Sequence, residues 1–375
     1  MSAEELRVCP EFRLLRRGRF LFAELLVSHV VLSTSARNGG QRTGLRFLLN
    51  HQSCEGGDHR ERMAYMAELG QEGYHDAACR EAGVDPRHTA MMGTAANMNY
   101  AALVAKHDGD VSVTAVVTAG VQGNAACAGD AARWRETASG WEKVAPYPGT
   151  INTILLISHP LTEGALARSV VTMTEAKSSA LQRLAVRSLY SADMATGTGT
   201  DQYIVAAAMK DSKPFTSTST HVKLGELAGQ AVREATLESL RWQNGLEPSY
   251  TRGIFHALGC HGVKEATFLA DIAPLLSDRE AELLRHNDKA VFHEPLVGAA
   301  AHAMAAVLDR VRCGTLPGSA ANEAVRQQAA NLAASLASRP ECWSEFHGKL
   351  TAAGAADPKP LILAAIALGW SARWR

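Results

Sequence analysis

The character of the sequence changes near residue 240, and this change divides the chain into two parts that must fold differently. Before it, short runs of β-branched and aliphatic residues alternate with helical patterns. After it, Ala- and Leu-rich segments of helical period follow one another, separated by prolines. We therefore expect an α+β fold: a mixed sheet flanked by helices, followed by an all-helical C-terminal region. We place a leader at residues 1–18, the α+β domain at 19–240 and the helical region at 241–375.

Several segments of the first part carry clear secondary-structure signals. The apolar run Phe20–Leu32 predicts a single buried strand, and Gly70 and Gly73 are expected to break a helix over 58–82. An Asp-Gly turn at 108–109 between apolar runs predicts a hairpin. The remaining predicted elements are strands at 150–158 and 202–208 and helices at 160–187, 221–240, 263–275, 277–288, 295–312, 319–337 and 359–368.

Composition limits the classes of function. The chain carries 38 Lys+Arg against 38 Asp+Glu, so it lacks the overall positive field that holds nucleic acid or anionic lipid. Glu24 and His29 interrupt the apolar run that follows an Arg-rich start, which argues against an export signal. The sequence contains no uninterrupted run of about 18 apolar residues, so we expect no membrane-spanning helix. Seven cysteines without paired spacing indicate reduced thiols, so we expect a cytoplasmic protein.

Polar motifs follow or precede the predicted strands. Each is weak alone; the Gly-Thr-Gly-Thr turn, for example, is either a phosphate cradle or a tight turn at a strand entrance, and it lacks P-loop spacing. In chain order the motifs are NGG at 38–40, TAGV at 118–121 with Asn124, AGD at 128–130, GTIN at 149–152, TEAK at 174–177, ATGTGTD at 195–201 and TH-x-KLGEL at 220–227.

In this order the motifs resemble those of the adenosylcobinamide amidohydrolase family, over roughly residues 20–235. The resemblance implies hydrolysis of the amide that joins the corrin ring's propionate arm to 1-amino-2-propanol, giving adenosylcobyric acid for cobalamin salvage. It implies a corrinoid small molecule as the partner, with cobalt belonging to the substrate, so no cofactor is expected. Whether the protein forms a homo-oligomer stays open. The tail beyond residue 240 lies outside the resemblance.

An amide hydrolase needs an activated nucleophile, donors for the developing oxyanion and an acid for the leaving amine. We predict that His221 and either Glu175 or Asp201 move protons, while Lys177 and backbone groups near Gly120 stabilise charge. Glu175 and Lys177 are two residues apart, so only one of them faces a given side of a regular helix.

Neutral amides and hydroxyls suit a corrin rim that carries many amides. The predicted substrate-binding residues are Asn38, Asn50, Thr118, Gly120, Asn124, Asn152, Thr198 and Thr200. No nucleophile can be assigned, because no G-x-S-x-G elbow is present and no local signature marks Cys127. We expect no metal site, although three groups of possible ligands occur. These groups are His51 with Cys54 and His59, His75 with Cys79, and His256 with Cys260 and His261.

Two other functions remain open. A non-catalytic corrinoid carrier would use the same surface without hydrolysis, and the number of titratable motif residues weighs against it. A nucleotide-dependent kinase acting on a cobinamide hydroxyl would use the Gly-Thr-Gly-Thr turn, and the missing P-loop argues against it.

Overall fold

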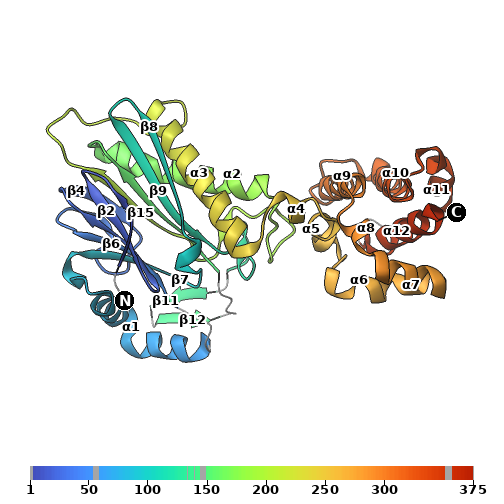
Figure 1. Ribbon diagram of the computed structural model, residues 1–375, viewed down its shortest axis with the longest axis horizontal. Helices are drawn as coiled ribbons and strands as arrows, with labels where there is room; N and C mark the ends of the chain where they lie inside the picture. The colour runs from blue at the N-terminus through green and yellow to red at the C-terminus, as the bar shows by residue number, and fades with distance from the viewer. Residues whose placement is uncertain are drawn as a thin grey trace. The chain divides into compact units, whose positions relative to one another are not determined.

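A computed structural model describes residues 3–53, 59–132, 134–138, 140–143, 149–350 and 357–374. The chain divides into two compact units, Met1–Leu246 and Glu247–Arg375 (Figure 1). The first mixes strands and helices, and the described part of the second is helical, which confirms the predicted α+β class with a helical C-terminal region. None of the described helices is long and apolar enough to cross a membrane.

The centre of the first unit is a six-stranded sheet, the central sheet. The strand β13 (Ile151–Ile157) is buried at every position, as its continuous apolar run predicts. It runs parallel to β15 (Gln202–Ala208) and antiparallel to β9 (Val111–Ala119). The full order is β5 (Gly40–Arg42), β4 (His29–Ser33), β15, β13, β9 and β8 (Ala102–Asp108). The predicted hairpin is confirmed as β8–β9.

A second sheet, the outer sheet, packs face to face on the central one. Leu14, Leu48 and Met92 of the outer sheet share a buried core with Ile154 and Leu156 of β13. The order is β1 (Glu4–Val8), β2 (Phe12–Arg17), β3 (Phe20–Leu25), β6 (Phe47–Gln52) and β7 (Thr89–Thr94). Only the β6–β7 pair in it is parallel.

The prediction of one strand over Phe20–Leu32 is wrong. The run splits into β3 and β4, which belong to different sheets. Leu26 and Val27 between them are exposed and carry the chain from one sheet to the other. An apolar run shows that both halves are buried, but it does not show that they share a sheet. Residues 1–18, placed outside the domain as a leader, contain β1 and β2, and β2 pairs with β3 along its length.

Three helices cover the two outer faces of the paired sheets. The helix α1 (His59–Ala82) packs on the outer sheet through Ala78 and Cys79, and Gly70 (φ +66°) interrupts it as predicted. The helices α2 (Glu163–Arg183) and α3 (Lys223–Asn244) cover the central sheet. The result is four layers: α1, the outer sheet, the central sheet, then α2 and α3 (Figure 1). Two small ribbons complete the unit, β10 (Ala125–Ala126) with β14 (Gly197–Thr198) and β11 (Trp134–Thr137) with β12 (Gly140–Lys143).

The second unit is built around α9 (Pro295–Arg312), α10 (Gly318–Ala337) and α12 (Lys359–Arg373). A Cβ on Gly369 would lie 2.5 Å from the main-chain oxygen of Ala333, so glycine permits the close approach of α12 to α10. The other helices are α4 (Pro248–Thr251), α5 (Ile254–Leu258), α6 (Glu265–Ile272), α7 (Asp278–Asn287), α8 (Lys289–Phe292) and α11 (Trp343–Lys349). All five helical segments predicted for this region are helical.

Two buried histidines link the stability of the first unit to pH. His29 and His75 are each 1% exposed, and burial lowers the pKa of each below its usual value of 6.5. Hydrogen bonds to Val27 and Pro86 and the nearby carboxylates oppose this shift without reversing it. The unfolded chain therefore binds protons that the folded chain does not as the pH falls through about 6.5.

We expect the urea midpoint of unfolding to be highest above pH 6.5 and to fall between pH 7.5 and pH 5.5. The double variant His29→Gln/His75→Gln should lose less stability over this interval than the wild type, whatever its stability at pH 7.5. Circular dichroism measures both. The variant His286→Gln, at a largely exposed position, serves as the control. An equal loss in wild type and double variant would contradict this account.

Candidate active site

Most of the polar motifs gather at one end of the central sheet, where β9 ends and β13 and β15 begin. Across β9 and β13, Thr118 pairs with Asn152, and Asn152 pairs with Gln202 of β15. Because β13 and β15 are parallel, the turns that precede them lie side by side. We call this part of the protein the Asp201 end.

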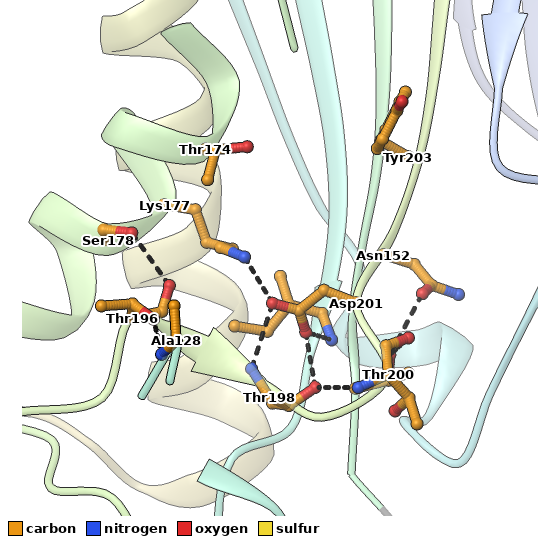
Figure 2. A network of polar contacts seen from close by, with 12 residues as sticks. Ala128, Asn152, Thr174, Lys177, Ser178, Thr196, Thr198, Thr200, Asp201 and Tyr203 are labelled. Atoms are coloured by element: carbon orange, nitrogen blue, oxygen red, sulfur yellow. Dashed lines mark hydrogen bonds and ion pairs between the residues drawn. The ribbon is translucent and has the colours of Figure 1, made fainter. Parts of the chain in front are cut away.

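The carboxylate of Asp201 is the most heavily bonded group at this end (Figure 2). One oxygen accepts the main-chain N–H of Ile151 at 2.9 Å and the hydroxyl of Thr198 at 2.5 Å. The other accepts the main-chain N–H of Thr198 at 3.1 Å and the ammonium of Lys177. Both carboxylate oxygens accept hydrogen bonds, and the side chain is only 17% exposed. Asp201 is therefore placed to hold its neighbours in position rather than to accept a proton as a base.

Lys177 reaches Asp201 from the inner flank of α2. Its side chain is 14% exposed, and its ion pair with Asp201 uses one of three N–H donors. In the part of the chain that the structure describes, no protein acceptor takes the other two. A fixed, mostly buried ammonium with free donors suits a carbonyl oxygen on which negative charge develops.

Gly197 leaves the space that this ion pair occupies. A Cβ at residue 197 would lie 2.2 Å from Oδ2 of Asp201 and 2.6 Å from Nζ of Lys177. Both contacts are far inside van der Waals distance, so a side chain here would displace one of the two charged groups. Gly197, the first glycine of the ATGTGTD motif, is therefore explained by the ion pair rather than by a phosphate cradle.

Asn124 ties the two neighbouring turns together. Its Nδ2 donates to the main-chain oxygen of Gly149 at 2.8 Å, and the hydroxyl of Thr200 donates to the same oxygen at 2.8 Å. The hydroxyl of Tyr190 donates to Oδ1 of Asn124 at 2.7 Å. Gly149 has φ +151°, and a Cβ there would lie 2.8 Å from Cβ of Asn124. Tyr190 lies outside every sequence motif, so no motif pointed to its role.

A buried chain of amides joins the two sheets at the same end. The Nδ2 of Asn152 donates to Oδ1 of Asn50 at 2.8 Å and to the main-chain oxygen of Gly93 at 3.1 Å. The Nδ2 of Asn50 donates to the hydroxyl of Thr118 at 2.8 Å. Asn50, Thr118 and Asn152 are 2%, 0% and 0% exposed, so in this structure their side chains bond to one another and to the main chain.

Two predicted binding residues use their polar groups within the protein. Asn38 has φ +59°, and its Nδ2 donates to the main-chain oxygens of Pro86 and Thr89. The N–H of Gly120 donates to Thr150 at 3.0 Å. The N–H groups of the flanking residues, 119 and 121, donate to the side chains of Ser239 and Asn244. The N–H groups of residues 119 to 121 are therefore all bonded within the protein and are not free for an oxyanion.

The structure does not bring Glu175 to the ion pair. Glu175 is exposed, and its position on α2 is about 200° around the helix from Lys177. It makes no hydrogen bond or ion pair with any residue that the structure describes. This agrees with the expectation that only one of the two residues faces a given side.

His221 lies toward the opposite end of the central sheet. It is exposed and precedes α3, a helix of 22 residues and therefore about 33 Å long. The other end of α3 is at the Asp201 end, because the hydroxyl of Ser239 accepts the N–H of Ala119 at 2.9 Å. The pKa of Lys223, at the start of α3, is raised mainly by Glu226 and further by Asp108 of the β8–β9 hairpin.

A cluster of Ser158, His159 and Asp110 occupies that opposite end. The hydroxyl of Ser158 and Nδ1 of His159 are 3.1 Å apart, and Nε2 of His159 is 3.3 Å from Asp110. The order matches that of a hydrolytic triad, and the sequence reasoning missed it. Ser158 is only 5% exposed, however, and its oxygen already accepts the N–H of Ser112 at 2.8 Å. The cluster therefore fastens the end of β13 to the hairpin.

Among the residues that the structure describes, the cysteines and histidines form no alternative centre. Burial raises the pKa of the Cys127 thiol, and Asp130 and Asp193 raise it further, which is the reverse of nucleophile activation. Burial raises the pKa of Cys79 to about 12. No three potential ligands among the described residues lie close enough together to hold a metal ion. Cys54, one of the possible ligands considered with His51, lies outside the described residues.

Comparison with known sequences identifies the class of proteins to which this four-layer unit belongs. The model of the adenosylcobinamide amidohydrolase family matches residues 7–248, well over half of the chain, and the chain belongs to this family. Membership implies hydrolase activity and a corrinoid substrate. The chain is also similar to a Methanocaldococcus jannaschii protein described as uncharacterized, with 32% identity over 188 residues. This match covers 46% of the chain and 71% of that protein.

Gly197→Ala should destabilise the first unit by about 1–3 kcal/mol, because the new methyl group overlaps the Lys177–Asp201 pair. Urea unfolding followed by circular dichroism measures the loss. Gly164→Ala, where a Cβ meets no atom within 4 Å, is the matched control and should cost nothing measurable. Equal midpoints for the two variants would show that the pair tolerates the methyl group.

Asn152→Ala should also destabilise the unit by about 1–3 kcal/mol, because it leaves the buried Oδ1 of Asn50 and the partly buried oxygen of Gly93 without their donor. The same measurement applies. Asn99→Ala, at an exposed position, is the control and should be within about 0.5 kcal/mol of wild type. If Asn152→Ala left the free energy of unfolding unchanged, the amide chain would not be what holds the sheets together.

Proposed function

We propose that this protein hydrolyses the amide between the corrin ring's propionate arm and 1-amino-2-propanol in adenosylcobinamide, giving adenosylcobyric acid for cobalamin salvage. Family membership over residues 7–248 supports the substrate class. The single observation that carries the chemistry is the ammonium of Lys177, held by Asp201 with two donors free. A salvage role also favours a cytoplasmic location.

In this reaction water adds to the carbonyl carbon, negative charge builds on the carbonyl oxygen, and the C–N bond breaks as the amine takes up a proton. Lys177 would donate to that oxygen and stabilise the charge. Asp201 would hold Lys177 in place and is a positioning residue. Glu175 and His221 stay predictions as proton-transfer groups, because they rest on the motifs and not on proximity to Lys177. We propose no resident cofactor; the cobalt belongs to the substrate.

The test is incubation of purified, EDTA-treated protein with adenosylcobinamide, without ATP or added metal, with products followed by mass spectrometry. We expect adenosylcobyric acid and free 1-amino-2-propanol. Unchanged substrate that stays bound to the protein would instead favour a corrinoid carrier. A product that gains phosphate, formed only when ATP is added, would favour a kinase.

Lys177→Met should lower kcat by about 100-fold or more while the protein stays folded, because one donor to the oxyanion is lost. Lys213→Met, at an exposed position on another loop, is the matched control and should keep full activity. The same assay on Glu175→Gln and His221→Ala tests the motif assignments. A Lys177→Met enzyme with normal kcat would overturn the role given to Lys177.

A further inference from the structure

A partly exposed apolar strip lies on the helix-facing side of the central sheet, and its Tyr203 end is two residues from Asp201, the partner of Lys177. It consists of Val30 and Leu32 of β4, Tyr203 of β15 and Val170 of α2, all packed at the margin of the core between the sheet and the helices. Val30 and Leu32 alternate with buried neighbours that face the outer sheet, so both side chains lie on the helix-facing side. The strip therefore continues one face of the sheet beyond α2.

The position of the two helices explains why this strip is open. The main packing of α3 is over β8 and β9, and α2 packs on β15 beside it. Thr172 of α2 faces α3, with its methyl carbon 3.9 Å from the Cβ position of Gly229. Val170 and Lys177 lie on the other flank of α2, toward β4. The helix-facing side of β4 is thus the margin of the helical layer.

Tyr203 stands at the end of the strip nearest the ion pair. Figure 2 shows Tyr203 on the strand side and Thr174 on the helix side, with Lys177 and Asp201 below and between them. The main-chain oxygen of Tyr203 accepts the N–H of Thr34 at 3.1 Å. Its phenol hydroxyl has no hydrogen-bond partner among the residues that the structure describes. Tyr203 therefore presents a half-buried ring and an unused donor.

We propose that this strip, with Tyr203 at its end, receives one apolar face of the corrin ring and so places the propionate amide at Lys177. The inference rests on the proposed function and names the surface that binds the substrate. An aromatic ring and three aliphatic side chains suit a flat apolar macrocycle, and the phenol suits a neutral amide on its rim. The strip itself contains no charged side chain, as a rim of neutral amides requires.

Recognition of the substrate then has two parts, one at the strip and one at Lys177. The strip contacts the ring and not the aminopropanol group, so it binds cobinamide and the hydrolysis product alike. Lys177 contacts the reacting carbonyl. A change in the strip should therefore alter Kd and KM, whereas a change at Lys177 should alter kcat.

The experiment measures binding of cobinamide by isothermal titration calorimetry and KM and kcat for adenosylcobinamide, on the full chain. Tyr203→Ala should raise Kd and KM about tenfold with kcat within about twofold of wild type. Tyr203→Phe, which keeps the ring, should raise them much less. Tyr65→Ala, a partly exposed tyrosine on α1, is the control and should change neither. If Tyr203→Ala does not fold, Val170→Ser, at a partly exposed helix position, replaces it.

The outcomes separate this proposal from the proposed function. Wild type that binds cobinamide without hydrolysing adenosylcobinamide would overturn the hydrolase, and a raised Kd in Tyr203→Ala would still support the strip. Wild type that hydrolyses its substrate, with Kd and KM unchanged in a folded Tyr203→Ala, would overturn the strip alone. Wild type that does not bind cobinamide would overturn both.

Discussion

The carboxylate of Asp201 is the contact on which the candidate site depends. It accepts donors from the start of β13, from the turn before its own strand and from α2, so one side chain joins three segments that are far apart in sequence. The pair with Lys177 is mostly buried, and removing one partner of such a pair leaves an uncompensated charge. Gly197 keeps the space open for both groups. The position of Lys177 is therefore set by the fold before any substrate binds.

Most of the motif residues serve this arrangement indirectly. Asn124 and Thr200 fasten the turn before β13 to the turn before β15, and Asn50 and Asn152 join the two sheets beneath them. The side-chain amides of these three asparagines are bonded to protein partners, as the polar groups of buried residues generally are. Lys177 differs, because its charge is fixed while two of its donors stay free in the described structure. Residues of these motifs thus differ in their bonding: most are bonded within the scaffold, whereas Lys177 keeps two donors without a partner among the described residues.

The sequence predicted the local structure well because local structure follows periodicity. The continuous apolar run of β13, the Asp-Gly hairpin and the amphipathic α3 each carry their own signal. Helical geometry also separated Glu175 from Lys177 correctly. The split of Phe20–Leu32 between two sheets was not predictable, because burial on both faces looks the same in either sheet. A motif likewise shows which residues are polar but not at which end of a sheet they lie. His221 belongs to a motif, yet it lies toward the end opposite Asp201.

The layering has a consequence for how a large substrate can approach Lys177. The outer sheet closes one face of the central sheet, and α2 and α3 close much of the other, so the partly exposed apolar residues of β4 and Tyr203 of β15 lie where the helical layer ends. A broad, flat ligand cannot enter the packed core, but it can lie against the margin of a sheet with one edge directed at the ion pair. A small polar ligand would gain nothing from such a surface. The combination of an apolar margin with a fixed ammonium therefore favours a substrate that is mostly apolar face with one reactive amide at its rim.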